Sequence, residues 1–218
     1  MRYRVQMLVV ASLLIGLQSA ARAADPYAHV IIVGDSLMAT ADKDPYTSTT
    51  AMLLNVEYGL RTTNISRSGQ LLAGAVGADV GGAVAYLTAG SVSKTAVWIT
   101  LGHNDWFLSR STQQMGDDYR KLVTSMPVNV DVFCVVPPIA IWDYNHELRN
   151  GKPYEHLRNI VRFVAHHFDC QLVETADWVG EQQLFDGSSI PDGVHFSGLA
   201  HAIYASKLLA TLRRATVP

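Results

Sequence analysis

The sequence has almost no excess charge, and this deficit excludes one class of partner. Seventeen Lys and Arg residues oppose nineteen Asp and Glu residues, which leaves a formal net charge of -2 over 218 residues. The basic residues form no cluster, whereas binding to a phosphate backbone depends on clustered Lys and Arg. We therefore expect no nucleic acid as a partner.

Cysteine is also scarce, with only Cys134 and Cys170 in the chain. Two cysteines without a Cys-x-x-Cys spacing do not make a zinc site, so no metal is expected from them. In an oxidising compartment the two could form a disulfide. Both lie at strand-like positions, where a free buried cysteine is common. The sequence leaves both states open and favours free thiols.

Long hydrophobic runs are absent beyond the N-terminus. Residues 1–23 combine a basic start (MRYR), an apolar run (VQMLVVASLLIGL) and small residues at Ala21 and Ala23. This order is typical of a secretory signal that is cleaved after Ala23. A membrane anchor is the alternative, but the run falls short of the ~20 residues that a spanning helix needs. We expect an exported protein, periplasmic or secreted, without stable membrane insertion after cleavage.

In the remaining chain, short apolar runs alternate with longer helical patterns. Strands are predicted at 29–34, 61–66, 95–102, 129–138 and 170–175. Helices are predicted at 47–59, 70–90, 112–126, 154–168 and 197–214. Strands separated by helices form a parallel sheet with helices on both faces. The prediction is one α/β domain over residues 24–218, a three-layer α/β/α sandwich with a five-stranded parallel sheet.

Polar residues follow several of these strands. GDSL at 34–37 places Ser36 after the first strand, SRSGQ places Gly69 after the second, and GHND at 102–105 places Asn104 after the third. PDGVH supplies Asp192 and His195 before the last helix. Because the carboxyl ends of parallel strands share one edge of the sheet, these residues are expected to converge there.

The converging residues suit nucleophilic catalysis. A serine hydroxyl such as that of Ser36 is a weak nucleophile until a base takes its proton. His195 can be that base, and Asp192 can orient its ring. The N–H groups of Ser36 and Gly69 and the amide of Asn104 can form an oxyanion hole, in which each donor contributes about 3 kcal/mol. Each residue alone also has an ordinary structural role, and only their joint occurrence favours catalysis.

Two acidic residues next to the candidate site residues, Asp35 beside Ser36 and Asp105 beside Asn104, are expected to have structural roles. Asp35 is interpreted as a carboxylate that stabilises its own turn. Asp105 is interpreted as a cap of the helix that follows it.

The sequence resembles the SGNH (GDSL-type) hydrolase family over essentially the whole chain after residue 23. Four motifs carry the resemblance, in the order of the family: GDSL at 34–37, Gly69, GHND at 102–105 and DGVH at 192–195. The resemblance implies a flavodoxin-like SGNH hydrolase fold and a serine esterase that forms an acyl-enzyme on Ser36, without metal or organic cofactor. Small exported members that the chain resembles act as thioesterase, lysophospholipase and arylesterase. Many members carry a glycine a few residues after the serine, where this chain has Thr40.

The expected substrate is a small-molecule, lipid-derived or carbohydrate ester. The expected pocket residues are Met38, Trp106, Trp142 and Tyr144. Carbohydrate O-acetylesterase or O-acyltransferase activity with the same triad stays open, and so does a non-catalytic envelope binding protein. The sequence predicts neither the acyl chain length nor the oligomeric state.

Overall fold

The computed structural model describes residues 25–39, 49–138, 153–175, 178 and 195–215. The predicted signal peptide lies outside these described residues, and so do Thr40, Trp142, Tyr144 and Asp192. In the described part of the chain, no helix combines the length and the apolar character needed to cross a membrane.

Five parallel strands form one sheet in the order β2-β1-β3-β4-β5. They are β1 (His29–Gly34), β2 (Arg61–Asn64), β3 (Thr95–Thr100), β4 (Val130–Val136) and β5 (Gln171–Glu174). The order reverses beside β1, so β1 and β3 are neighbours at the topological switch point. In open α/β sheets this point is where ligands bind. The predicted parallel sheet is therefore confirmed, together with its five strands.

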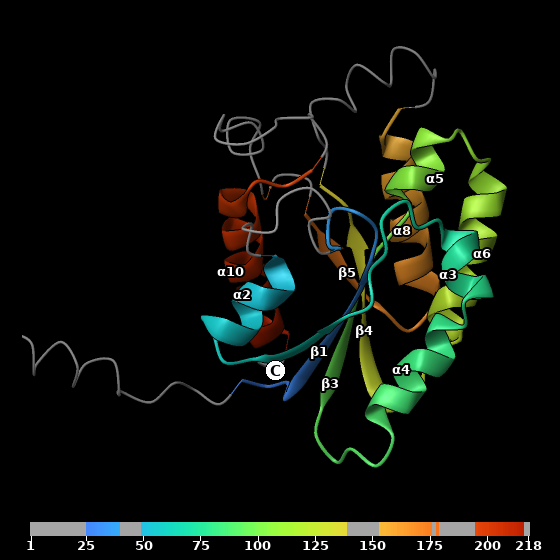
Figure 1. The fold of residues 1–218 in the computed structure, drawn as a ribbon. Coiled ribbons are helices and arrows are strands. Elements are labelled where there is room, and N and C mark those ends of the chain that lie inside the picture. Colours follow the sequence, from blue (N-terminus) through green and yellow to red (C-terminus); the bar gives the residue numbers. More distant parts are fainter. Residues whose placement is uncertain (1–24, 40–48, 139–152, 176–177, 179–194, 216–218) are drawn as a thin grey trace, which may run out of the picture.

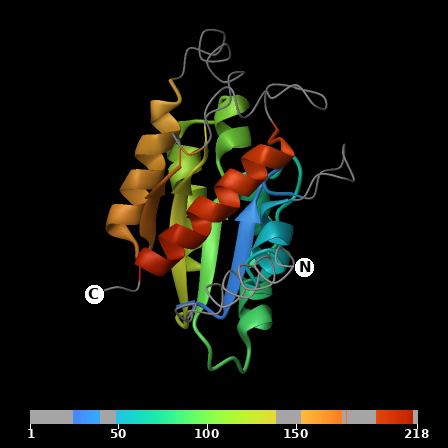
Figure 2. The same cartoon turned by 90° about the vertical axis from the view of Figure 1, so that its left-hand side faces the viewer.

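Helices cover both faces of the sheet (Figure 1). One face carries α2 (Thr50–Val56) and α10 (Gly198–Arg214), and Figure 2 shows α10 running diagonally across it. The other face carries α3 (Leu72–Gly77), α4 (Val80–Thr88), α6 (Thr112–Thr124) and α8 (Glu155–His167). A short helix, α5 (His103–Phe107), follows β3. These are the three layers that the alternation of elements predicts.

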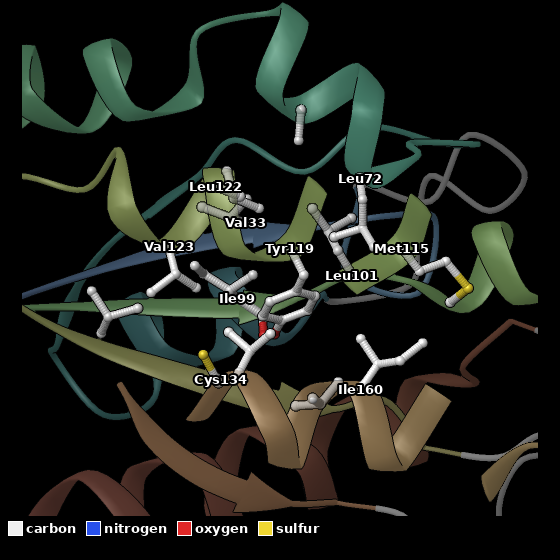
Figure 3. Packing of buried hydrophobic residues seen from close by; sticks show 14 of the residues in the cluster. Val33, Leu72, Ile99, Leu101, Met115, Tyr119, Leu122, Val123, Cys134 and Ile160 are labelled. Atoms are coloured by element: carbon white, nitrogen blue, oxygen red, sulfur yellow. The ribbon is translucent and has the colours of Figure 1, made fainter. Parts of the chain in front are cut away.

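The central strands are continuous apolar runs because both of their faces are buried. All six residues of β1 and all six of β3 are buried. Successive side chains point to opposite faces, so Ile32 and Trp98 pack under α10, whereas Ile31 and Ile99 pack under α6 and α8. Figure 3 shows the second cluster, in which Tyr119 and Leu122 of α6 lie over Ile99.

The segment predicted as one helix over 70–90 is two helices, α3 and α4. The break comes at Asp79, whose φ of 50° lies in the left-handed region and whose carboxylate accepts a hydrogen bond from Gly82 N at 3.0 Å. Asp79 is thus the N-cap of a new helix. At Gly81 a β-carbon would come within 2.5 Å of the backbone oxygen of Ser125, so only glycine lets α4 approach the end of α6 this closely.

Cys134 and Cys170 form a disulfide, so the preference for free thiols was wrong. Cys134 lies on β4 opposite Leu172, and Cys170 directly precedes β5. The pairing of these strands brings the two α-carbons to 5.8 Å, within the usual range for a bridge. The sequence separation of 36 residues does not reveal this neighbourhood.

Candidate active site

Ser36 lies in a tight turn directly after β1. Asp35 O accepts hydrogen bonds from Met38 N at 3.1 Å and from Ala39 N at 2.8 Å. The Asp35 carboxylate accepts another from Leu37 N at 3.0 Å, which confirms its predicted role in the turn. Between Asp35 and Ala39, Ser36 alone is not buried. The turn therefore presents the Ser36 side chain at the carboxyl edge of the sheet.

A second contact holds this turn from the side. Asn64, the last residue of β2, donates its amide to Met38 O at 2.6 Å and accepts a hydrogen bond from Ser66 N at 3.1 Å. It thereby joins the Ser36 turn to the loop that carries Gly69. Sequence reasoning missed Asn64, although a polar residue at the end of a strand next to Ser36 was a usable signal.

The loop from β2 to α3 runs beside the end of β1. Arg67 N donates to Gly34 O at 3.1 Å, and Gln70 N donates to Arg67 O at 3.1 Å. Inside this turn Gly69 has a φ of +69°, which is the left-handed region that favours glycine. The N–H groups of Ser36 and Gly69 donate to no described residue, so both are available to an incoming oxygen atom.

Asn104 lies at the start of α5, next to the same loop. Its amide nitrogen donates to Gln70 O at 3.2 Å. An amide carries two N–H donors, so the second one remains for a ligand. Helix α5 starts here because Gly102 adopts a φ of +110° before it. The structure thus brings the three predicted oxyanion-hole residues onto adjoining segments.

Asp105 is not the cap of the following helix, contrary to our interpretation. Ser111 caps α6, because its hydroxyl accepts a hydrogen bond from Gln114 N at 3.2 Å. Asp105 is fully buried and accepts from Leu72 N at 2.9 Å, and its other oxygen pairs with Arg110. Asp105 therefore ties α5 to the start of α3. The neighbouring residue Asn104 ties α5 to Gln70, two residues before Leu72 in the chain.

His195 lies three residues before α10 and is half-buried. The next residue, Phe196, is buried, and its ring packs 5.2 Å from that of His201 and 5.5 Å from that of Tyr204. Ser197 caps α10, because its hydroxyl accepts a hydrogen bond from Ala200 N at 3.1 Å. These contacts anchor the segment that carries His195.

His195 interacts by charge with Asp35, the residue that precedes Ser36. Burial raises the pKa of the Asp35 carboxyl, and charge interactions with His103 and His195 oppose the rise. This interaction supports the prediction that His195 and Ser36 belong to one site, which stays a prediction. Asp192 lies outside the described residues, so its orienting role stays a prediction.

Two of the expected pocket residues, Met38 and Trp106, are core residues. Met38 has no exposed surface, and Trp106 is only 1% exposed. The Trp106 ring packs edge-on against Tyr154 at 5.2 Å and stacks with His103 at 6.1 Å. Packing explains both positions, and a pocket role for these residues stays a prediction.

No cluster of three or more His, Cys, Asp or Glu side chains that could hold a metal occurs within the described ranges.

A serine on a tight turn, donors from three adjoining segments and a histidine at the sheet's carboxyl edge define a serine ester hydrolase. The sequence comparison agrees with this class. The model of the GDSL-like lipase/acylhydrolase family matches residues 32–203, and the chain belongs to this family. No curated protein sequence matches the chain.

Solved structures share the fold. TesA has a TM-score of 0.66 at 20% identity, with 85% of this chain and 98% of TesA covered. EstA, a psychrotrophic esterase from Pseudoalteromonas sp., has a TM-score of 0.62 at 17% identity, with 86% and 98% covered. Est24, a carbohydrate acetylesterase from Sinorhizobium meliloti, has a TM-score of 0.55 at 19% identity, with 84% and 99% covered.

Proposed function

We propose that the protein is an exported serine esterase that hydrolyses small or lipid-derived acyl esters through an acyl-enzyme on Ser36. The observation that carries this proposal is the convergence at one edge of the sheet of a half-buried serine and N–H donors that lack a partner among the described residues. Ser36 and Gly69 each offer a backbone N–H, and Asn104 offers an amide N–H.

The reaction follows from these groups. His195 takes the Ser36 proton while the hydroxyl oxygen attacks the ester carbonyl. The negative charge that develops on the carbonyl oxygen is stabilised by the three donors. His195 then gives its proton to the leaving alcohol, and the acyl group remains on Ser36. Water, activated by the same histidine, attacks the acyl-enzyme and releases the acid.

The test is turnover of 4-nitrophenyl esters from acetate to octanoate, together with labelling by a fluorophosphonate. Ser36→Ala and His195→Ala should each lower kcat by at least about 10³-fold, because each removes a reacting group. Asp192→Ala should cost less, since an orienting residue does not react. Ser93→Ala, in the exposed loop before β3, is the matched control and should keep wild-type kcat.

Two results would overturn parts of this proposal. Absence of both turnover and Ser36 labelling would favour the alternative of a non-catalytic envelope binding protein. Dominant transfer of the acyl group to an added carbohydrate, in place of hydrolysis, would favour an O-acyltransferase. Turnover confined to acetyl esters of carbohydrates would narrow the function to an O-acetylesterase.

Export is proposed from the first 23 residues, and the Cys134–Cys170 disulfide supports it because disulfides persist in oxidising compartments. We expect chain isolated from the envelope or medium of a bacterial host to start at Ala24. Intact-mass measurement checks this, and a full-length mass would contradict it.

A further inference from the structure

A cavity of about 110 Å³ is lined in part by the chain segments that carry Ser36 and Gly69. It lies among the end of β1, the loop from β2 to α3, and the segment from α3 to α4. Its lining residues are Val33, Gly34, Ile65, Arg67, Gln70, Ala75, Ala78, Val80 and Ala83. Gly34 is two residues from Ser36, and Gln70 follows Gly69 and accepts the amide of Asn104. The cavity therefore contacts the segments that would hold the reacting carbonyl.

The size of this cavity limits what enters it. Alanine and glycine leave the space open, and valine and isoleucine make most of the remaining wall apolar. An apolar cavity of about 150 Å³ holds a benzene molecule. On that scale, 110 Å³ suits a chain of roughly three or four carbons.

Arg67 is the charged residue among the described residues that line the cavity. Its backbone is fixed by the hydrogen bond from Arg67 N to Gly34 O, while its guanidinium makes no hydrogen bond or ion pair within the described part of the chain. By contrast, Arg110 and Arg162 each bind two carboxylates. Among the residues that the structure describes, no Asp or Glu lines the cavity. Arg67 is exposed to solvent, so its guanidinium at the cavity wall is accessible and suited to bind a carboxylate or phosphate through paired N–H groups.

We propose that this cavity is a specificity subsite for esters in which the portion entering it is short and carries a carboxylate or phosphate that Arg67 binds. The inference rests on the proposed esterase function and adds a substrate class to it. The apolar wall selects for length, and Arg67 selects for negative charge.

The charge test compares esters that differ only at one end. In the acyl half, 4-nitrophenyl pentanoate is compared with the 4-nitrophenyl monoester of glutarate and with its 4-phosphonobutanoate analogue. In the alcohol half, sec-butyl acetate is compared with O-acetyl-3-hydroxybutanoate. We expect kcat/KM about tenfold higher for the anionic ester in at least one half.

Arg67→Gln should abolish that preference, whereas Arg67→Lys should retain part of it. Arg61→Gln is the matched control, because it removes the same charge from the opposite end of β2 and should leave the preference intact. Equal kcat/KM for anionic and neutral esters in both halves would overturn the inference. So would a preference that persists in Arg67→Gln.

The length test narrows the cavity. Ala83→Leu places a larger side chain on an exposed position of the α4 wall and should lower kcat/KM for pentanoate relative to acetate about tenfold. Ala85→Leu, on the same helix but outside the lining, should not change the ratio. Ala78→Leu repeats the test if Ala83→Leu does not fold. An unchanged length profile in the folded variant contradicts the subsite.

The two proposals fail in different ways. If Ser36 is labelled and 4-nitrophenyl acetate is hydrolysed, but charge and length preferences are absent, only the subsite is wrong. If labelling and turnover are both absent, the esterase function is wrong and the subsite falls with it.

Discussion

Asp105 and Arg110 form an ion pair beneath the candidate oxyanion hole, and one partner has no contact with water. The Asp105 side chain is fully buried, and that of Arg110 is 19% exposed. Arg110 also binds Asp118 at 2.8 Å, and these hydrogen bonds raise the pKa of its guanidinium. Because Asp105 accepts a hydrogen bond from Leu72 N, the pair links α5, the helix of Asn104, to the start of α3.

Removing the arginine should destabilise the protein strongly. Arg110→Ala leaves a buried carboxylate without its cation, and breaking a buried pair in this way costs about 3 kcal/mol or more. Urea unfolding should show this loss. Arg120→Ala is the control, since its ion pair with Asp117 is half-exposed on both sides and its loss should cost less than about 1 kcal/mol. Equal losses in the two variants would contradict the assignment.

At the scale of elements, the Cys134–Cys170 disulfide links two strand segments covalently. It joins β4 to the start of β5, which has four residues and, among the described strands, pairs with β4 alone. A crosslink stabilises mainly by restricting the unfolded chain, and the effect grows with the length of the closed loop.

Reduction of the disulfide should lower the free energy of unfolding by about 3–4 kcal/mol, the expectation for a loop of 36 residues. Urea unfolding with and without dithiothreitol measures the change. The double variant Cys134→Ala/Cys170→Ala checks it, and reductant should have no effect on that variant. An unchanged midpoint for the wild type under full reduction, verified by thiol titration, would refute the expectation.

At the scale of the whole molecule, the buried His201 links α10 to α2, the two helices on one face of the sheet. His201 on α10 is 3% exposed, and its Nδ1 accepts a hydrogen bond from Thr50 N of α2 at 3.2 Å. Burial lowers the pKa of His201 to about 4, whereas the ring titrates near 6.5 in an unfolded chain. Between these values only the unfolded chain takes up the proton.

The free energy of unfolding should therefore contain a term that is complete above pH 6.5 and is lost as the pH falls towards 4. From pH 7.5 to 4.5 this term amounts to about 2–3 kcal/mol. The raised pKa of Asp35 acts in the opposite sense, so the variant difference is the measurement. His201→Gln, which keeps an acceptor for Thr50, should flatten the pH dependence. His166→Gln, on the exposed surface of α8, should not.

The sequence by itself determined the sheet and the candidate catalytic set. Strand positions follow from short apolar runs, which local burial preferences produce without reference to distant residues. Ser36, Gly69 and Asn104 were found because parallel strands deliver their following loops to one edge of the sheet.

Contacts between distant segments decided the rest. The Cys134–Cys170 bridge depends on β4 and β5 being neighbours, and the role of Asp105 depends on α3 lying beside α5. The cavity with Arg67 requires the end of β1, a loop and two helices to meet. None of these has a local signature, because each is set by which surfaces pack together when the apolar faces are buried.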